Sequence, residues 1–218
     1  MECISDADLY QKGLFMEGRR APVCTIALVV INVVVFFVLS FGGRTEDALY
    51  MVDHGAMYVP YFLIDQEYYR IFTCMFLHFG FEHLMNNMVT LLIVGRYLEP
   101  VVGKVRFVII YLVSGLGGSV LSLIGELRTG DYAVSAGASG AIFGLTGALL
   151  SLAILNRGRI AGLTKQGIIL MTVLSLYNGF VSEGVDNLAH IGGLVCGFLV
   201  TFLLCFYRYT KRRTDFGF

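Results

Sequence analysis

Charged residues are scarce in this sequence of 218 residues: they make up 15% of it, whereas soluble domains carry about 25%. Hydrophobic residues make up 56%, and the mean hydropathy is +0.74. The formal net charge is zero, so bulk charge points neither to nucleic acid nor to an acidic partner. The shortage of charge, together with this apolar content, indicates an integral membrane protein whose surroundings are the lipid bilayer.

Paired cysteines, internal repeats and low-complexity segments are also lacking. The few cysteines show no paired spacing and lie mostly in apolar runs, which favours buried thiols over a disulfide or zinc framework: Cys3, Cys24, Cys74, Cys196 and Cys205. We therefore expect no metal and no cofactor. The absence of a repeat weakens a transporter interpretation. A cleavable signal peptide is not expected, because the first apolar run begins near Ala21 after a charged lead and is long enough to span.

Six apolar runs approach the roughly 20 residues that a transmembrane helix needs. They cover about 22–42, 80–98, 104–125, 138–156, 166–182 and 187–207. The second run is the least regular, because polar residues crowd its start. The sequence thus predicts an all-α polytopic membrane protein. Its predicted organisation is a short cytoplasmic segment 1–20, a six-span domain 21–208 and a basic cytoplasmic tail 209–218.

The positions of the basic residues predict the orientation of these spans. If the N-terminus lies inside, only Arg44, Arg70 and Arg128 of the 16 Lys and Arg residues fall outside. The positive-inside rule therefore places both termini in the cytoplasm. The first outer loop, about 43–79, is long and rich in Tyr and Phe, so we expect it to lie partly in the membrane interface.

The stretch SAGASGAIFG, residues 135–144, opens the fourth predicted span. Small residues allow close helix packing in lipid, and a serine can bond back to its own helix. We assign packing to the Gly-x-x-x-Gly pairs of this span and of the sixth, Gly140/Gly144 and Gly193/Gly197. Alternatively, one of the serines is a nucleophile.

The expected depths of the polar residues in the membrane favour Ser139 as the nucleophile. Ser139 and His190 each precede a basic residue by 18 positions, or roughly 27 Å of helix. His83 lies at a similar height, roughly 24 Å above the inner end of its span. A histidine inside a span is costly and suggests function, and Ser with His is the minimal nucleophile–base pair.

Other polar groups could stabilise an oxyanion near this serine. His83 and Asn87 share a helix face and can both donate hydrogen bonds. Ser139 begins a helix, so its own N–H favours negative charge there. Gly137 and Gly140 leave room for a substrate backbone.

These residues resemble the rhomboid intramembrane serine proteases. The resemblance runs from about Tyr69 to Tyr207 and rests on four spaced motifs: GASG (137–140), AHIGG (189–193), HLMNN (83–87) and GRYLE (95–99). It implies a six-transmembrane-helix rhomboid bundle with Ser139 as nucleophile, His190 as general base and acid, and His83 and Asn87 at the oxyanion. Asn86, beside Asn87 but turned about 100° around the helix, is secondary.

The resemblance also implies what the protein acts on. The expected substrates are transmembrane proteins cut in or near their spans, entering sideways from lipid past a gate formed by the fifth span and the loop 183–187. The compact six-span form, with no presequence and no seventh span, suggests the plasma membrane of a prokaryote. The oligomeric state is left open.

Two departures from the family pattern concern aromatic residues. The family often has Trp-Arg in the first loop, whereas this chain has Tyr69-Arg70 and no Trp at all. Some members have Tyr one turn after the nucleophile, where this chain has Phe143, which can stack on the base but cannot hydrogen-bond.

Three further residues near the predicted site could have structural or catalytic roles. Asp186, four residues before His190, could complete a triad if that segment is helical, although the family uses a dyad. His54 and His78 are interpreted as structural or interfacial.

The competing functions are a rhomboid-like membrane chaperone that binds spans without cutting them, and a small transporter or channel. Trapping of Ser139 by a fluorophosphonate would separate the protease from both.

Overall fold

The computed structural model describes residues 21–156, 159–160, 163–181 and 184–215, and these form a helical bundle. The predicted segment 1–20 and the last residues of the predicted tail lie outside the described residues. The long helices are α2 (Val23–Gly42), α6 (Gly80–Val102), α7 (Lys104–Thr129), α8 (Ser139–Leu155), α9 (Lys165–Val181) and α10 (Asn187–Asp215). The short elements are α3 (Ala48–Asp53), α4 (Val59–Leu63), α5 (Arg70–Thr73), the 3-10 helix η1 (Cys74–Phe76), β1 (Arg159–Ile160) and β2 (Leu163–Thr164).

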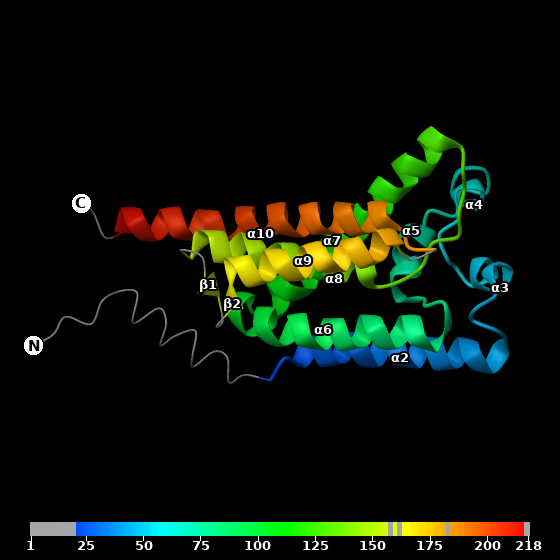
Figure 1. Cartoon of the computed structure of the whole chain (residues 1–218), viewed down its shortest axis with the longest axis horizontal. Coiled ribbons are helices and arrows are strands. Elements are labelled where there is room, and N and C mark those ends of the chain that lie inside the picture. Colours follow the sequence, from blue (N-terminus) through cyan, green and yellow to red (C-terminus); the bar gives the residue numbers. More distant parts are fainter. Residues whose placement is uncertain (1–20, 157–158, 161–162, 182–183, 216–218) are drawn as a thin grey trace, which may run out of the picture.

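The prediction of an all-α fold is confirmed, with a small exception at one end. The two-residue strands β1 and β2 pair antiparallel in a hairpin between α8 and α9. In Figure 1 this hairpin lies at one end of the bundle, and α3, α4 and α5 lie at the other. The long helices run between these two ends.

Among the described residues, three helices are long and apolar enough to cross a membrane: α2, α7 and the Asn187–Cys205 part of α10. The apolar helix α8 is shorter, at 17 residues. Most of its residues are buried, as expected for a helix that is apolar around its whole circumference. The number of spans and the position of the termini stay predictions.

The buried apolar core lies mainly among α6, α7 and α8, and α8 also packs closely against α10. Glycines permit this packing: a Cβ atom on Gly193 would overlap the carbonyl oxygen of Gly140, and one on Gly197 would overlap that of Gly144. The two helices therefore touch backbone to backbone, which confirms the packing role expected for both Gly-x-x-x-Gly pairs.

The helix α2 is fixed to α6 by a buried carboxylate. Glu99, 3% exposed, accepts hydrogen bonds from the backbone N–H groups of Cys24 (2.9 Å) and Thr25 (2.8 Å) and from the Thr25 hydroxyl (2.7 Å). The first N–H groups of a helix have no partner inside it, so Glu99 caps α2 from a neighbouring helix.

The first loop is folded around a buried arginine. Arg70, 2% exposed, donates from Nη1 to the carbonyl oxygens of Val52 (2.5 Å) and Ala56 (2.8 Å) and pairs with Glu67. These bonds join α3 and α5, and the Arg70 guanidinium also lies 5.0 Å from the ring centroid of Tyr61 in α4. The first loop also pairs its Met57 backbone with that of Ser135 and accepts from the Gly137 N–H at the Cys74 carbonyl, so it helps to position the residues described next.

Candidate active site

Ser139 and His190 meet at the end of the bundle that carries the first loop. Ser139 is the first residue of α8, and His190 lies in the first turn of α10. The Oγ atom of Ser139 is 2.9 Å from Nε2 of His190. Ser139 is half-buried and His190 is 7% exposed, so the pair lies just below the surface. The structure thus brings together two residues that the sequence placed only at the same height.

The histidine ring is held by an aromatic neighbour. Phe143, one turn after Ser139, stacks on His190 with ring centroids 4.3 Å apart and planes inclined by 21°. For the Ser139 hydroxyl to donate to Nε2, that nitrogen must be unprotonated, so Nδ1 carries the proton of the neutral ring. Among the described residues, Nδ1 has no hydrogen-bond partner, and it faces Gly179 of α9.

Gly137 lies between the serine and a second histidine. A Cβ atom built on Gly137 would lie 2.9 Å from Cε1 and 3.0 Å from Nε2 of His83, and 3.6 Å from the Ser139 Oγ. The His83 ring and the Ser139 hydroxyl therefore border the same small space, which the missing side chain leaves open. Gly137 also has φ of +145°, a conformation that L residues rarely adopt.

Asn87 lies on the same helix face as His83, one turn further along α6. Its side-chain amide donates to the His83 carbonyl at 3.0 Å, which uses one of its two N–H groups. Asn86 is exposed. Gly140 is buried against Ala189 of α10: a Cβ atom added to Gly140 would lie 3.3 Å from the Ala189 carbonyl oxygen. The room expected beside Gly140 for a substrate is therefore filled by α10, and of the two glycines Gly137 alone borders both Ser139 and His83.

His78 supports the loop that carries Ser139. It is 1% exposed, its Nε2 accepts from the Ala138 N–H at 3.4 Å, and its ring meets that of His83 edge-on at 5.2 Å. Burial, aided by the neighbouring His83, lowers the pKa of His78 to about 3, which keeps the ring neutral and able to accept. The structural role expected for His78 is thus found, but the contact with Ala138 is not readable from spacing.

Asp186 does not form the triad that its spacing allowed. Its carboxylate accepts from the Ser122 and Ser135 hydroxyls and from the Ala189 N–H. The other histidine of the first loop, His54, is exposed and bonds the Tyr50 carbonyl from Nδ1 at 2.7 Å. Within the described part of the chain, no three His, Cys, Asp or Glu side chains gather in a way that could hold a metal ion.

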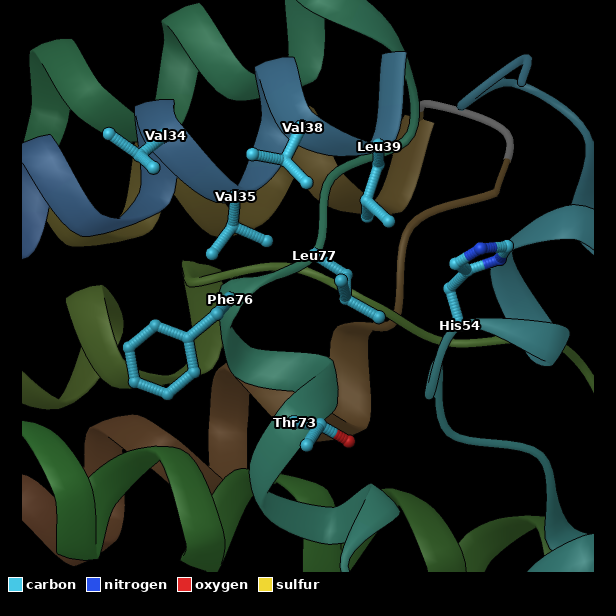
Figure 2. Close-up of a pocket in the computed structure, with 8 residues that line it drawn as sticks. All are labelled: Val34, Val35, Val38, Leu39, His54, Thr73, Phe76 and Leu77. Carbon is cyan, nitrogen blue, oxygen red and sulfur yellow. The ribbon is translucent and has the colours of Figure 1, made fainter. Parts of the chain in front are cut away.

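A pocket of about 400 Å³ lies apart from this site, between α2 and the first loop (Figure 2). Its lining is mostly aliphatic and aromatic: Val34, Val35, Val38, Leu39, His54, Thr73, Phe76 and Leu77. The Thr73 hydroxyl already donates to the Gly55 carbonyl at 2.7 Å, and His54 is bonded to Tyr50. The pocket therefore offers little reactive chemistry, in contrast to the serine–histidine pair.

Comparison with known proteins agrees with this geometry. The family model described as the Rhomboid domain matches residues 65–207, which include every residue of the site. This chain belongs to the rhomboid family. It is accordingly a multi-pass membrane protein.

Several rhomboid relatives are similar over much of this chain. Rhomboid protease GluP of Bacillus subtilis (strain 168) is 36% identical over 86% of this chain and 36% of its own length. RHOMBOID-like protein 5 of Arabidopsis thaliana is 44% identical over 63% of this chain and 44% of its own length. The putative rhomboid protease YdcA of Bacillus subtilis (strain 168) is 35% identical over 63% of this chain and 67% of its own length. The matched part thus spans less than half the length of the first two relatives.

Proposed function

We propose that this rhomboid is an intramembrane serine endopeptidase that hydrolyses peptide bonds in or near the transmembrane segments of membrane proteins. The observation that carries the proposal is the 2.9 Å contact between Ser139 Oγ and His190 Nε2. A serine next to an unprotonated imidazole nitrogen is an activated nucleophile. Two of the relatives, GluP and YdcA, are named as proteases, which supports the same reaction.

The reaction begins with attack of Ser139 Oγ on the scissile carbonyl carbon, while His190 Nε2 takes the hydroxyl proton. The carbonyl oxygen becomes an oxyanion, for which the Ser139 N–H, His83 and Asn87 are the donors. Ser139 begins α8, and the N–H groups of a first turn have no partner within the helix. His190 then gives the proton to the leaving amine as the peptide C–N bond breaks.

Water completes the reaction. It attacks the acyl-enzyme ester, passes a proton to His190, and the proton returns to Ser139 as the ester bond breaks. The site is half-buried at one end of the bundle, so water and an unwound substrate segment can both approach it. Every step uses side chains and backbone groups of this chain, and the proposal needs no cofactor.

The proposed placement has α2 and α6–α10 as six spans in a prokaryotic plasma membrane, with both termini cytoplasmic. Residues 21–208 then form the protease domain, flanked by the segment 1–20 and the tail 209–218. In this arrangement Lys104 and Lys165, at the starts of α7 and α9, face the cytoplasm. The substrate enters from lipid past α9, whose exposed apolar residues include Val173, Tyr177 and Phe180.

A membrane chaperone that binds spans without cutting them is the second candidate function. It is less well supported, because such a protein has no need for a hydrogen-bonded Ser139–His190 pair with a space open beside it. The two functions differ in whether Ser139 reacts.

The test is cleavage of a helical transmembrane substrate in liposomes by the wild type, Ser139→Ala and His190→Ala, together with fluorophosphonate labelling. We expect each variant to lose at least about 10³-fold in kcat/KM. Ser151→Ala is the matched control, because Ser151 is a buried serine of the same helix, and it should stay within about threefold of the wild type. Cleavage that survives in Ser139→Ala would overturn the assignment. A wild type that binds substrate but is never labelled would favour the chaperone.

A further inference from the structure

Asp186 occupies the position immediately before α10, where it acts as the helix cap. Its Oδ1 accepts from the Ala189 N–H at 2.9 Å, and its backbone carbonyl accepts from the His190 N–H at 3.2 Å. Aspartate at this position supplies a partner for the free N–H groups of the first turn. The cap therefore fixes the turn of α10 in which His190 lies.

The second carboxylate oxygen of Asp186 makes contacts that a cap does not need. Oδ2 accepts from the Ser122 hydroxyl of α7 at 2.5 Å and from the Ser135 hydroxyl at 2.7 Å. Hydrogen bonds to an ionised acceptor are short and stronger than neutral ones. One carboxylate thus joins three parts of the chain that are distant in sequence: α7, the loop before α8 and the start of α10.

Ser135 belongs to the loop that delivers the nucleophile, four residues before Ser139. The backbone of Ser135 pairs with Met57, with both N–H···O distances 2.9 Å, and the Gly137 N–H donates to the Cys74 carbonyl at 2.9 Å. These main-chain bonds hold the loop against the first loop. The Ser135 hydroxyl instead donates to Asp186, the residue immediately before α10, and α10 is the helix that carries His190.

We infer that Asp186 is a positioning residue, whose carboxylate bridges the first turn of α10 to the Ser135 loop and thereby sets the spacing of His190 and Ser139. The inference rests on the proposed serine protease function. It gives Asp186 no contact with reacting atoms, because its carboxylate is directed at Ser122, Ser135 and Ala189 and not at His190 Nδ1. The bridge matters because small errors in the placement of reacting groups cost large factors in rate.

Four variants separate the bridge from the cap. Asp186→Ser keeps a good capping residue but lacks the second oxygen, whereas Asp186→Asn keeps the cap and carries an amide that can donate to both hydroxyl oxygens. Ser135→Ala removes the loop side of the bridge and leaves the cap intact. Ser122→Ala is the matched control, because it removes the same kind of bond from α7, away from the nucleophile.

The measurements are the rate of fluorophosphonate labelling of Ser139, kcat and KM for a transmembrane substrate, and the thermal midpoint as a check on folding. We expect Asp186→Ser and Ser135→Ala each to slow labelling and lower kcat about tenfold with little change in KM. Their double variant should be no slower than either, since both remove one bridge. Asp186→Asn and Ser122→Ala should label within about threefold of the wild type.

Labelling of a folded Asp186→Ser at the wild-type rate would overturn the inference and leave the proposed function standing. If the rate losses of Asp186→Ser and Ser135→Ala multiply in the double variant, the inference is also overturned, because the two residues would then act separately. If Asp186→Ser does not fold, Ser135→Ala decides the matter by the same criterion. A wild type that is neither labelled nor active would overturn the proposed function, and the inference with it.

Discussion

Gly137 is the residue whose missing side chain keeps the space beside Ser139 open. It has a positive φ and lies between the His83 ring and the Ser139 hydroxyl. Its neighbour Ala138 has ordinary helical angles and is the residue immediately before α8. A side chain added at Gly137 would therefore meet two obstacles, backbone strain and a close contact with the His83 ring. A control glycine with a positive φ but no close neighbour separates the two effects.

Gly137→Ala should lower cleavage activity by at least about 30-fold, because the new methyl group would press on the His83 ring and distort the space for the oxyanion. Gly130→Ala is the control: Gly130 also has a positive φ, +73°, but an added Cβ would meet nothing within 4 Å. Both variants should lose stability through backbone strain, and only Gly137→Ala should lose activity. Equal activity of the two folded variants would contradict this account.

The lowered pKa of buried His78 predicts that the stability of the fold depends on pH. Its pKa falls from 6.5 to about 3 on burial, so the unfolded chain binds a proton between these values that the folded chain does not. Stability therefore rises with pH in this window, and it is lost as the pH falls below about 6.5. Thermal midpoints at pH 8 and pH 5 should differ more for the wild type than for His78→Gln, which has nothing to protonate. The same pH dependence in both would show that His78 does not contribute.

At the scale of elements, the contact of α8 with α10 decides whether the serine and the histidine can meet. Gly193 and Gly197 face Gly140 and Gly144, and backbone atoms of the two helices are in contact. Such contact fixes both the distance and the register of the helices. Since Ser139 and His190 lie at the starts of these helices, their spacing depends on this register.

Gly197→Ala should destabilise the protein by about 1–3 kcal/mol, because its methyl group would overlap the rigid carbonyl of Gly144. Gly125→Ala on α7 is the contrast, since its methyl group would meet only the side chain of Leu188, chiefly its flexible end at Cδ1. Unfolding free energies in detergent check the difference. A Gly197→Ala variant as stable as Gly125→Ala would mean that the helices separate easily and that the backbone contact is not required.

At the scale of the whole molecule, the proposed orientation rests on the distribution of the basic residues. The hairpin of β1 and β2 lies at one end of the bundle, and the short helices α3, α4 and α5 of the first loop lie at the other (Figure 1). The proposed cytoplasmic side is the hairpin end. Catalysis would then take place near the outer surface.

Cysteine accessibility tests this orientation. In a chain with its native cysteines replaced, Lys104→Cys places an exposed thiol at the start of α7 and Asp131→Cys places one just after its end. A membrane-impermeant maleimide should label Asp131→Cys in intact cells and Lys104→Cys only after lysis. The opposite pattern would invert the topology and place the site on the cytoplasmic side.

The apolar runs of the sequence predicted the positions of the helices closely. The predicted runs 22–42 and 138–156 correspond to α2 and α8. Apolar length is this informative because a chain in lipid must satisfy its backbone hydrogen bonds within each segment, so apolar runs become helices. The last run was predicted to end at 207, whereas α10 continues to Asp215, since backbone hydrogen bonding can persist after the apolar residues end.

Which polar groups meet depends on how the helices and loops pack together. The four-residue spacing allowed Asp186 to reach His190 if that segment were helical. In the structure Asp186 instead caps α10 from outside the helix, and its carboxylate bonds to Ser135, 51 residues away. The contacts of His78 with Ala138 and of Arg70 with Val52 and Ala56 likewise join loops that no periodicity relates. Helical periodicity fixes directions within one element, whereas contacts between elements depend on how the elements pack, and here close glycine contacts set that packing.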